Sequence, residues 1–571
     1  MSKRTILGAM LMAFALHLNA QQKLADDRKG SSYNNPISAN IFCADPTALE
    51  YNGRLYVYGS NDHQQFIANG KKGENTYGAI KSIVVFSTDD MVNWTFHGTI
   101  DVAKLCSSWG WRFAASWAPS VTWRETADGK KEFFLYFANS GGSIGVITAS
   151  SPTGPWKSPL SKPFIDGDTP GVKPCNWIFD PGVLIDDEGT GWIAFGGGDP
   201  NSQGTKLMPG NSRIAKLKSS MLALDGKAVS LPAPYLFEAS ELNMMSGKYV
   251  YTYNTSWSDR NDWNQYAKRG SAPAPSTCSM CYMVSDNPLD PDSWQYKGEY
   301  VANPGTFGFG YGNNHTHLQK FNGEYYLFYH SMVLEQKMKT GASGFRSIGV
   351  NKASVNEDKQ TIGKVTMTNS GVSAIAKLNP YKLQQAETIA TAGGVSYEHF
   401  SNIKKNTTVS TLGNDASENQ QVRMNAGAWI MVRNVDFGTN GARSFMLRAR
   451  GTGTFEIRVN SRNATPSATI DFSSTGYEDY TVDLDIAKFK GVRNIYFVFT
   501  KSQNAYFDAW QFTENLPDGI TTTDVQDAPS ALYDLSGRRL SSDNLNRGIV
   551  IEKYKDSLGT LRTRKRVKSA K

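Results

Sequence analysis

The chain has 571 residues, which is too long for a single hydrophobic core, so two or three domains are expected. Its aromatic content of 12% and its 52 glycines favour a β-rich protein with many turns. The net charge of +8 comes from the two ends, because residues 1–20 carry +2 and residues 551–571 carry +6. The neutral body between them argues against nucleic-acid binding.

Residues 1–20, MSKRTILGAMLMAFALHLNA, combine a basic start, an apolar stretch and an ending in small residues. This pattern predicts a secretory signal peptide, which is too short to span a membrane. No later stretch is apolar over the length of a membrane-spanning helix. We therefore expect a secreted protein without a membrane span, located in the periplasm, at the cell surface or outside the cell.

Five later segments share one design: a short apolar strand, a glycine-containing turn and an aromatic-rich strand. The turns read NG, DG, EG, SG and NG, as in hairpin connections. The segments begin at Asp45, Trp117, Asp180, Glu238 and His315. Their spacing leaves room for four strands each, which predicts an all-β protein with a five-bladed β-propeller over residues 21–380. If the first strand of each blade is innermost, these five residues ring one mouth of the central channel.

Three of the five residues in this ring are carboxylic acids, which suits either a hard cation or acid–base hydrolysis. Inverting hydrolysis of a glycoside uses two carboxyl groups about 6.5–9.5 Å apart, with a water between them. Acids on different blades can meet that separation across a channel. A third carboxylate near the proton donor raises the pKa of the donor by like-charge repulsion. Aromatic residues at the mouth offer faces on which sugar rings stack.

Residues 41 to about 380 resemble glycoside hydrolase family 43. The motifs that carry the resemblance occur in family order and include ADPTALEYNGRLYVYGSND, SWAPSV, SPTGPW, FDPGVLIDDEG, FEAS and NNHTHLQKFNGEYYLFYH. The resemblance implies a five-bladed propeller and an inverting, exo-acting hydrolase of arabinose- or xylose-containing polysaccharides. By position it implies that Asp45 is the general base, Glu238 the general acid, and Asp180 the residue that tunes and orients the acid.

Glu241, three residues after Glu238, is the rival for the acid. Strand alternation predicts that the two side chains lie on opposite faces, and only Glu238 matches the family position. The cluster Asp186, Asp187 and Glu188 is expected to be a solvated hairpin turn.

The other two residues of the ring, His315 and Trp117, and one further residue, Arg346, each have both a functional and a structural interpretation. His315 resembles the family histidine that helps to hold a channel calcium ion through water. The family's common NNHHS reads NNHTH here, so either histidine can be the one that faces the channel. Trp117 either stacks on a sugar or packs within a blade. Arg346, in GFRSIGV, either reaches the site or forms a surface ion pair.

Residues 381–515 contain short strands and closely spaced turns, which predicts an antiparallel β-sandwich of the jelly-roll type. The stretches LQQAETIA, GAWIMVRNVDFG and YFDAWQF resemble carbohydrate-binding module family 6. That resemblance implies binding of xylan-like chains and a structural calcium near Glu387. Val432 stands where the family commonly has an aromatic residue, and Tyr477 is the candidate for a stacking platform. A purely structural sandwich is the alternative.

Residues 516–571 begin with a polar linker. The part that follows resembles the C-terminal sorting segment of secreted Bacteroidota proteins, and a disordered basic tail is the alternative. The five cysteines cannot all pair, and CSMC lacks the second cysteine pair that a zinc site needs. One disulfide, or buried thiols alone, is expected.

The sequence thus predicts a secreted glycosidase, an α-L-arabinofuranosidase acting on arabinoxylan or related plant cell-wall polysaccharide such as arabinan. The preference for arabinoxylan rests on the pairing with a module resembling family 6, which is analogy. Calcium is the one cofactor expected. β-Xylosidase and endo-arabinanase are alternatives on the same scaffold. A non-catalytic glycan-binding protein is the alternative of another class, and the presence of all three carboxylates argues against it.

Overall fold

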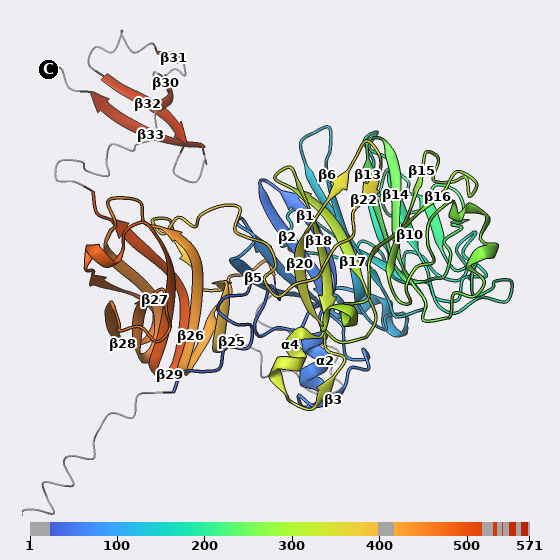
Figure 1. Cartoon of the computed structure of the whole chain (residues 1–571). Coiled ribbons are helices and arrows are strands. Elements are labelled where there is room, and N and C mark those ends of the chain that lie inside the picture. Colours follow the sequence, from blue (N-terminus) through green and yellow to red (C-terminus); the bar gives the residue numbers. More distant parts are fainter. Residues whose placement is uncertain are drawn as a thin grey trace, which may run out of the picture.

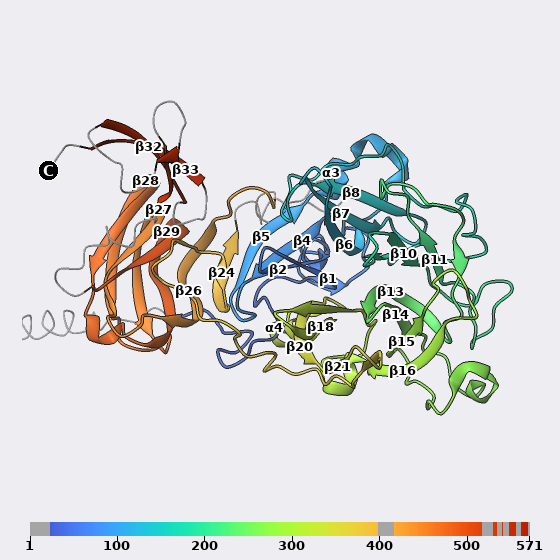
Figure 2. The same ribbon diagram turned by 90° about the horizontal axis from the view of Figure 1, so that it is seen from above.

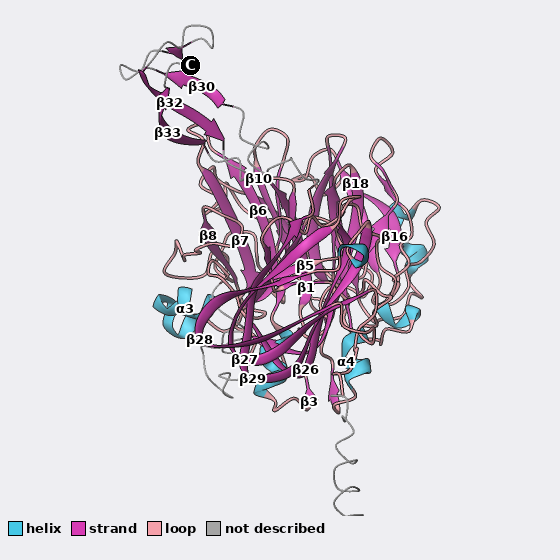
Figure 3. Ribbon diagram, turned by 90° about the vertical axis from the view of Figure 1, so that its left-hand side faces the viewer, coloured by secondary structure: helices cyan, strands magenta, loops and turns pink. Residues whose placement is uncertain are grey.

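Strands joined by turns make up most of the structure, a computed structural model, and its helices are few and short (Figure 3). It describes residues 23–397 and 416–516, and the backbone of four later strands at 529–533, 539–540, 548–555 and 561–568. The predicted signal peptide at residues 1–20 lies outside the described residues. Among the described residues, none of the helices has the length and apolar character needed to cross a membrane.

Five antiparallel sheets follow one another along the first part of the chain. The first contains β1 (Ala44–Tyr51), β2 (Arg54–Ser60), β4 (Ile83–Thr88) and β5 (Trp94–Ile100), and the second β6 (Trp117–Glu125), β7 (Lys131–Ala138) and β8 (Ile144–Ala149). The third contains β9 (Gly182–Ile185), β10 (Gly191–Phe195), β11 (Arg213–Lys216) and β12 (Val229–Ser230). The fourth contains β13 (Leu236–Met245), β14 (Lys248–Thr255), β15 (Met280–Ser285) and β16 (Gln295–Val301), and the fifth β17 (Thr316–Phe321), β18 (Glu324–Ser331) and β20 (Ser347–Ala353).

The turns that the sequence predicts are the hairpins within these sheets. Asn52 and Gly53, between β1 and β2, both have positive φ values of 53° and 74°. This is the backbone that a two-residue hairpin turn with the strand twist requires, and asparagine followed by glycine adopts it at little cost. The same turn therefore appears at Asn322 and Gly323, between β17 and β18.

The first strands of the five sheets contact one another in a closed order: β1 with β6, β6 with β9, β9 with β13, β13 with β17, and β17 with β1. Figure 2 shows the five sheets arranged around a common centre. The shorter elements lie in the connections: α2 (Asp62–Ala68), β3 (Gly73–Glu74), α3 (Val102–Leu105), η1 (Ser107–Arg112), η2 (Trp263–Gln265), η3 (Ala267–Arg269), η4 (Pro304–Phe307), α4 (Val333–Met338), β19 (Ala342–Ser343), β21 (Val355–Asn356) and β22 (Thr361–Ile362).

A second β domain follows, coloured orange in Figure 1. Its sheet has the order β25-β26-β29-β27-β28, and β23 also pairs with β29. The elements are β23 (Gln384–Gln385), β25 (Thr391–Tyr397), β26 (Val422–Asp436), β27 (Ala442–Val459), β28 (Ala468–Asp483), η6 (Ile486–Lys488) and β29 (Val492–Glu514). These long strands surround an apolar core that includes Phe445, Phe455, Phe497 and Trp510.

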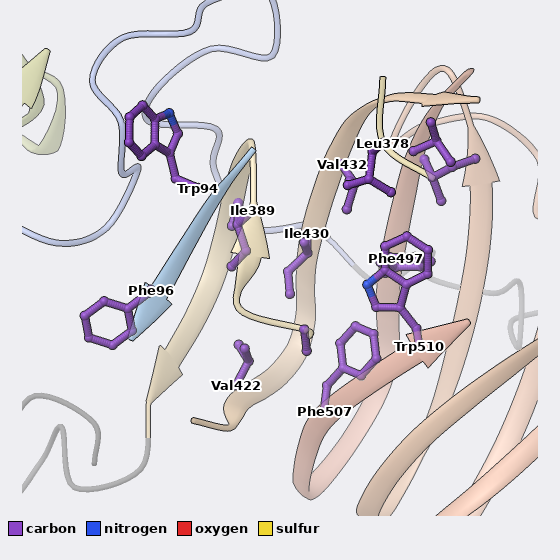
Figure 4. Close-up of a cluster of buried hydrophobic side chains, with 14 of the residues drawn as sticks. Trp94, Phe96, Leu378, Ile389, Val422, Ile430, Val432, Phe497, Phe507 and Trp510 are labelled. Atoms are coloured by element: carbon purple, nitrogen blue, oxygen red, sulfur yellow. The ribbon is translucent and has the colours of Figure 1, made fainter. Parts of the chain in front are cut away.

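The two β domains share a continuous hydrophobic core (Figure 4). Strand β24 (Thr388–Ile389) pairs with β5 at the edge of the first sheet, so the chain adds a strand to one domain just before it enters the other. Trp94 of β5 and Ile430 of β26 belong to the same buried cluster. Asn93 reinforces the junction, because its side chain donates to the Arg433 carbonyl and accepts from the Arg433 amide.

The last strands form a small sheet in the order β31-β30-β32-β33. They are β30 (Pro529–Tyr533), β31 (Arg539–Leu540), β32 (Gly548–Lys555) and β33 (Leu561–Lys568). The structure thus contains strands in this part of the chain, for which a disordered basic tail was the alternative prediction. All five cysteines lie in the described residues and all are free thiols, so of the two alternatives the disulfide is wrong. Four of the thiols are buried as expected, and Cys175 is partly exposed.

Candidate active site

One cavity of about 480 Å³ opens at the end of the five sheets where their first strands begin. All five residues that the sequence places in a ring line it. The full lining is Asp45, Tyr77, Trp117, Ser140, Gly141, Trp177, Phe179, Asp180, Phe237, Glu238, Asn313, His315 and Arg346. The lining therefore combines three carboxylic acids, one arginine, one histidine and a wall of aromatic rings.

Local backbone irregularities direct the acidic side chains into the cavity. Asp45 at the start of β1 and Asp180 just before β9 have φ values of 49° and 47°, and Ala239, directly after Glu238, has 61°. The pairing of β1 with β2 and of β13 with β14 shifts register at these points, as in a β-bulge. A bulge re-aims a side chain that a regular strand would place differently. The left-handed backbone costs about 1–2 kcal/mol at a non-glycine residue, so it marks a position held by its surroundings.

Asp45 is buried, and hydrogen bonds fix both of its carboxylate oxygens. Oδ1 accepts a 2.7 Å hydrogen bond from Arg346, and Oδ2 accepts one of 2.6 Å from the Ser60 hydroxyl. Burial alone would raise the pKa of Asp45, but the positive charge of Arg346 outweighs it. The pKa is therefore well below the usual range, and Asp45 is an anion at any working pH.

Arg346 is buried just before β20 and holds two carboxylates at once. Its Nε and Nη2 donate to Asp62 at 2.9 and 2.8 Å while Nη1 donates to Asp45. Its guanidinium also lies 5.1 Å from the ring centre of Tyr77. The flat guanidinium fork suits this geometry, which a lysine could not reproduce. Of the two interpretations of Arg346, the structure supports the residue that reaches the cavity.

Asp180 and Glu238 differ from Asp45 in protonation. Burial, followed by the negative charge of Asp45, raises the pKa of Asp180 to about 7, even though its Oδ2 accepts a 2.9 Å hydrogen bond from the Ala239 amide. Burial, followed by the charges of Asp180 and Asp45, raises the pKa of Glu238 well above its ordinary value. The cavity thus contains one carboxylate that stays ionised and one carboxylic acid that keeps its proton near neutral pH.

His315 lies between two of the acids, with Nδ1 3.7 Å from Asp45 Oδ1 and 3.9 Å from Asp180 Oδ2. Burial lowers the pKa of His315 to about 3, so the ring is neutral. A second histidine, His330, supports Asp45 from β18. Its Nε2 donates to the Asn313 carbonyl at 3.0 Å, so Nδ1 is free to accept from the Asp45 amide at 3.1 Å.

Glu241 does not line the cavity, but it also does not lie on the opposite face of its strand. It is buried between the first strands, where its Oε1 lies 3.0 Å from Nδ1 of His317 on β17. Strand alternation fails here because the bulge at Ala239 inserts a residue between the two glutamates. The same contact shows which histidine of NNHTH faces the cavity: His315 does, and His317 points toward Glu241.

Aromatic residues form much of the remaining wall. Trp117 lines the cavity, and its indole N–H donates to the Tyr77 carbonyl at 3.2 Å. Trp177 contacts the rings of Phe179 and Phe237 edge to face. Gly198 makes this possible, because a Cβ there would lie 2.9 Å from the Trp177 ring.

Sequence reasoning missed Tyr77, Asp62, Trp177 and His330. Tyr77 and Trp177 come from connecting loops, Asp62 begins the short helix α2, and His330 lies near the end of a second strand, so none of them falls in a periodic pattern. For His330 the sequence offers one signal, its position near the end of the aromatic stretch YLFYHS. In the structure this stretch pairs with the start of β20, next to Arg346. The turn residue Asp186 is buried and accepts from the Trp192 indole N–H, so the expected solvated turn is in part a structural anchor.

Two predicted residues lie outside the cavity, in the second β domain. Tyr477 on β28 is partly buried, and the guanidinium of Arg450 lies 5.4 Å from its ring centre. Glu387 is buried between β23 and β24, and its Oε2 has no hydrogen-bond partner among the residues that the structure describes. Within the described parts of the chain, no group of three or more histidine, cysteine, aspartate or glutamate side chains is arranged to hold a metal ion.

Comparison with protein families assigns both domains. The family model for glycosyl hydrolases family 43 matches residues 33–359, more than half of the chain. This chain belongs to glycoside hydrolase family 43. It is therefore an enzyme that hydrolyses O-glycosyl bonds, and the cavity with its three acids lies within the matched region. The model for carbohydrate binding module family 6 matches residues 385–514.

Two curated relatives cover most of the chain. One, from Paenibacillus polymyxa, is 36% identical over 90% of this chain and 81% of its own length, and is named arabinoxylan arabinofuranohydrolase. The other, from Bacillus subtilis, bears the same name and is 37% identical over 84% of this chain and 92% of its own length. A solved structure of a family 43 arabinoxylan arabinofuranohydrolase from Bacillus subtilis, in complex with cellotetraose, matches with a TM-score of 0.74. It is 35% identical, over 86% of this chain and 99% of the solved one.

Proposed function

We propose that this family 43 enzyme removes α-L-arabinofuranosyl side chains from arabinoxylan or a related hemicellulose, with inversion at the anomeric carbon. The observation that carries the proposal is the division of protonation states within one cavity: Asp45 is ionised and Glu238 is protonated near neutral pH. The names of the relatives that cover most of the chain support arabinose as the sugar removed and arabinoxylan as the polymer.

Asp45 is suited to be the general base. Arg346 and Ser60 orient its two oxygens and keep it ionised, so that it can accept a proton from a water beside the sugar. As the water oxygen bonds to the anomeric carbon, one of its protons passes to Asp45. Attack from this side, opposite to the leaving oxygen, inverts the anomeric carbon.

Glu238 is suited to be the general acid. It holds its proton because burial and two neighbouring carboxylates disfavour its anion. The proton passes to the glycosidic oxygen as its bond to the anomeric carbon breaks, so free arabinose and a polymer hydroxyl result. Asp180 supports this step, since its charge keeps Glu238 protonated and its hydrogen bond to the Ala239 amide fixes the backbone beside Glu238.

The aromatic wall is suited to hold a sugar ring. Trp117 and Trp177 present apolar faces to the cavity, and a sugar ring carries apolar C–H faces that such rings cover well. We therefore assign Trp117, and Trp177 with it, to substrate binding. The cavity of about 480 Å³ has room for a terminal sugar unit, which removal of side chains requires.

We extend the proposal to the fold type of the two domains, to sugar binding by the second domain and to secretion. The closed order of contacts among β1, β6, β9, β13 and β17 supports a five-bladed propeller with the cavity at one mouth of its channel. The long strands around a phenylalanine-rich core support a jelly-roll sandwich for the second domain. Sugar binding by this domain is part of the proposal, and Tyr477 with the neighbouring Arg450 is its candidate surface. We further propose that residues 1–20 direct the enzyme out of the cytoplasm.

Calcium at Glu387 is a separate part of the proposal. Its Oε2 is buried and has no partner within the described parts of the chain, and the pKa of Glu387 is raised well above its usual value by burial and by the charge of Asp508. Calcium takes oxygen ligands and would neutralise this pair of carboxylates. We also propose that the neutral His315 ring contacts a channel calcium through water. Chelation by EDTA should then lower the melting temperature and readdition of calcium should restore it. The decrease should be smaller in Glu387→Gln, which keeps only the channel calcium. Equal melting curves with and without EDTA would contradict the Glu387 site.

The decisive experiment measures which sugar is released. The purified enzyme is incubated with arabinoxylan, arabinan and the aryl glycosides of arabinose and xylose, and NMR follows the anomer that appears first. Arabinose from arabinoxylan, released first as the inverted anomer, is the expected result. Release of xylose would indicate a β-xylosidase, and release of oligosaccharides from arabinan an endo-arabinanase. Asp45→Asn should lose activity by several orders of magnitude, and activity equal to that of the wild type would contradict the base assignment.

A further inference from the structure

Exposed aromatic side chains are concentrated at the end of the first domain where the cavity opens. Among the described residues, five tryptophans or tyrosines are exposed: Tyr33, Trp111, Trp177, Trp257 and Tyr311. Four of them, all except Tyr33, belong to loops at the cavity end. Soluble proteins rarely gather such rings on one face unless a ligand or partner covers them.

The strand register places these loops at one end. Ala44 pairs with Ser60, Ser60 with Ile83, and Ile83 with Ile100, so the loop that follows Ile100 starts at the same end of the sheet as Asp45, on the outermost of these four strands. This loop, residues 101–116, contains Trp111 and ends at Trp117. In the fourth sheet, Val301 pairs with Met280 at the same end. The loop that follows Val301, residues 302–315, contains Tyr311 and ends at His315.

Tyr311 is built as a platform. Its side chain is 68% exposed, yet its ring lies directly over Gly305, where a Cβ would come within 2.5 Å of three ring atoms. The buried Asn303 fixes the loop on both sides, because its side chain accepts from the Gly305 amide at 3.0 Å and donates to the Gly312 carbonyl at 2.8 Å. One face of the ring is therefore covered by backbone and the other faces solvent.

Trp111 is even more exposed, at 86%, and its loop is equally fixed. Trp109 anchors the loop in the core, and the guanidinium of Arg112 lies 4.9 Å from the ring centre of Trp111. Asn139 ties the loop to the cavity rim, since its amide donates to the Arg112 carbonyl at 2.6 Å and its oxygen accepts from the Ala114 amide at 2.7 Å. The next two residues after Asn139, Ser140 and Gly141, line the cavity.

We propose that Trp111 and Tyr311 are stacking platforms for the pyranose rings of the polysaccharide main chain at two separate points of the cavity rim. The inference rests on the proposed function, in which the cavity takes one side-chain sugar, so the main chain must cross the mouth. An uncharged chain of pyranose rings offers flat apolar faces to both platforms, and aromatic rings supply large contact area at low entropic cost. The platforms thus favour a polymer over a small glycoside.

The test compares substrates with and without a main chain. Trp111→Ala and Tyr311→Ala should each lower kcat/KM on soluble arabinoxylan on the order of tenfold, while kcat/KM on 4-nitrophenyl α-L-arabinofuranoside stays within twofold of the wild type. Gly305→Ala should reproduce the loss on arabinoxylan, because the added methyl displaces the Tyr311 ring. Tyr311→Phe should keep most of the activity on arabinoxylan. Leu289→Ala, an exposed apolar residue at the other end of the fourth sheet, is the matched control.

A binding measurement separates this inference from the proposed function. In an Asp45→Asn background, retardation by arabinoxylan in native gels should weaken on replacement of Trp111 or Tyr311 and persist in the Leu289 control. If no variant changes the ratio of polymer to aryl glycoside activity or the retardation, the platforms are refuted while the active site stands. If the wild type releases arabinose from neither substrate, the proposed function fails, and the retardation assay alone decides whether the platforms bind the polymer.

Discussion

Replacement of Asp180 by asparagine should move the alkaline limb of the pH–rate profile to lower pH while the fold stays intact. The substitution removes a negative charge that raises the pKa of Glu238. It keeps the side-chain oxygen that accepts from the Ala239 amide, so the backbone beside Glu238 keeps its support. The change is therefore close to purely electrostatic.

The expected size follows from the interaction between two carboxylates. Two unit charges about 6 Å apart at an effective dielectric constant of about 20 interact by about 3 kcal/mol, which corresponds to about 2 pKa units. Asp180 has a raised pKa of about 7, so it is only partly ionised near neutral pH and its effect is smaller. We expect the alkaline limb to fall by about 1–2 pH units, because Glu238 loses its proton earlier. Asp45 stays ionised across this range, so the acid end of the profile should match that of the wild type.

The assay measures kcat/KM for a 4-nitrophenyl arabinofuranoside and for arabinoxylan from about pH 4 to pH 9. The loss of kcat/KM at alkaline pH should be larger on arabinoxylan than on the aryl glycoside, because a sugar hydroxyl is a poorer leaving group than 4-nitrophenolate and depends more on protonation by Glu238. Asp187→Asn, in the exposed turn of the third sheet, changes the net charge equally and is the matched control. If the alkaline limb of Asp180→Asn coincides with that of the wild type while its melting temperature is unchanged, the tuning role of Asp180 is refuted.

Two other substitutions test the groups that support the site. Arg346→Met should raise the pKa of Asp45, because burial then acts without its main opposing charge, so activity should be lost at the acid end of the profile; an unchanged acid limb would contradict this. His317→Gln should destabilise the protein by about 3–5 kcal/mol in urea unfolding, since it leaves the buried Glu241 carboxylate without its partner. The double variant with Glu241→Gln should recover part of the loss. Burial lowers the pKa of His317, but the neighbouring Glu241 carboxylate outweighs burial and raises it above the ordinary value. The pair therefore stabilises the protein fully below about pH 6.5, and this contribution should fade as the pH rises through the raised pKa. A free energy of unfolding that does not change over this pH range would contradict the pairing.

Much of the site could be predicted because its acids stand at the starts of strands with recognisable patterns. Asp45, Asp180 and Glu238 each precede or begin an apolar run followed by a glycine turn, so one repeated pattern located all three. Asp62 and His330 could not be found in this way. Asp62 contacts Arg346, 284 residues further along the chain, and His330 contacts Asp45, 285 residues before it. These residues meet only when the fifth sheet packs against the first.

The failure of alternation at Glu241 has a physical cause that also explains the active site. A regular β13 would turn either Glu238 or Glu241 toward the centre, but the bulge at Ala239 turns both, one into the cavity and one toward His317. The residue with positive φ in this bulge is an alanine, so the sequence contains no glycine from which the bulge could be predicted.

The same backbone conformation recurs where the chemistry is, and the residue types there explain why it is retained. Asp45 and Asp180 both have left-handed φ values and both precede proline, which disfavours helical backbone in the residue before it. Glycine would adopt this backbone without strain, but glycine cannot supply a carboxylate. A strained aspartate, held by Arg346 in one case and by the Ala239 amide in the other, is therefore the arrangement that aims an acid into the cavity where the chain enters the first strand of a sheet. Stability is given up at these two positions because no other residue type satisfies both the backbone and the reaction.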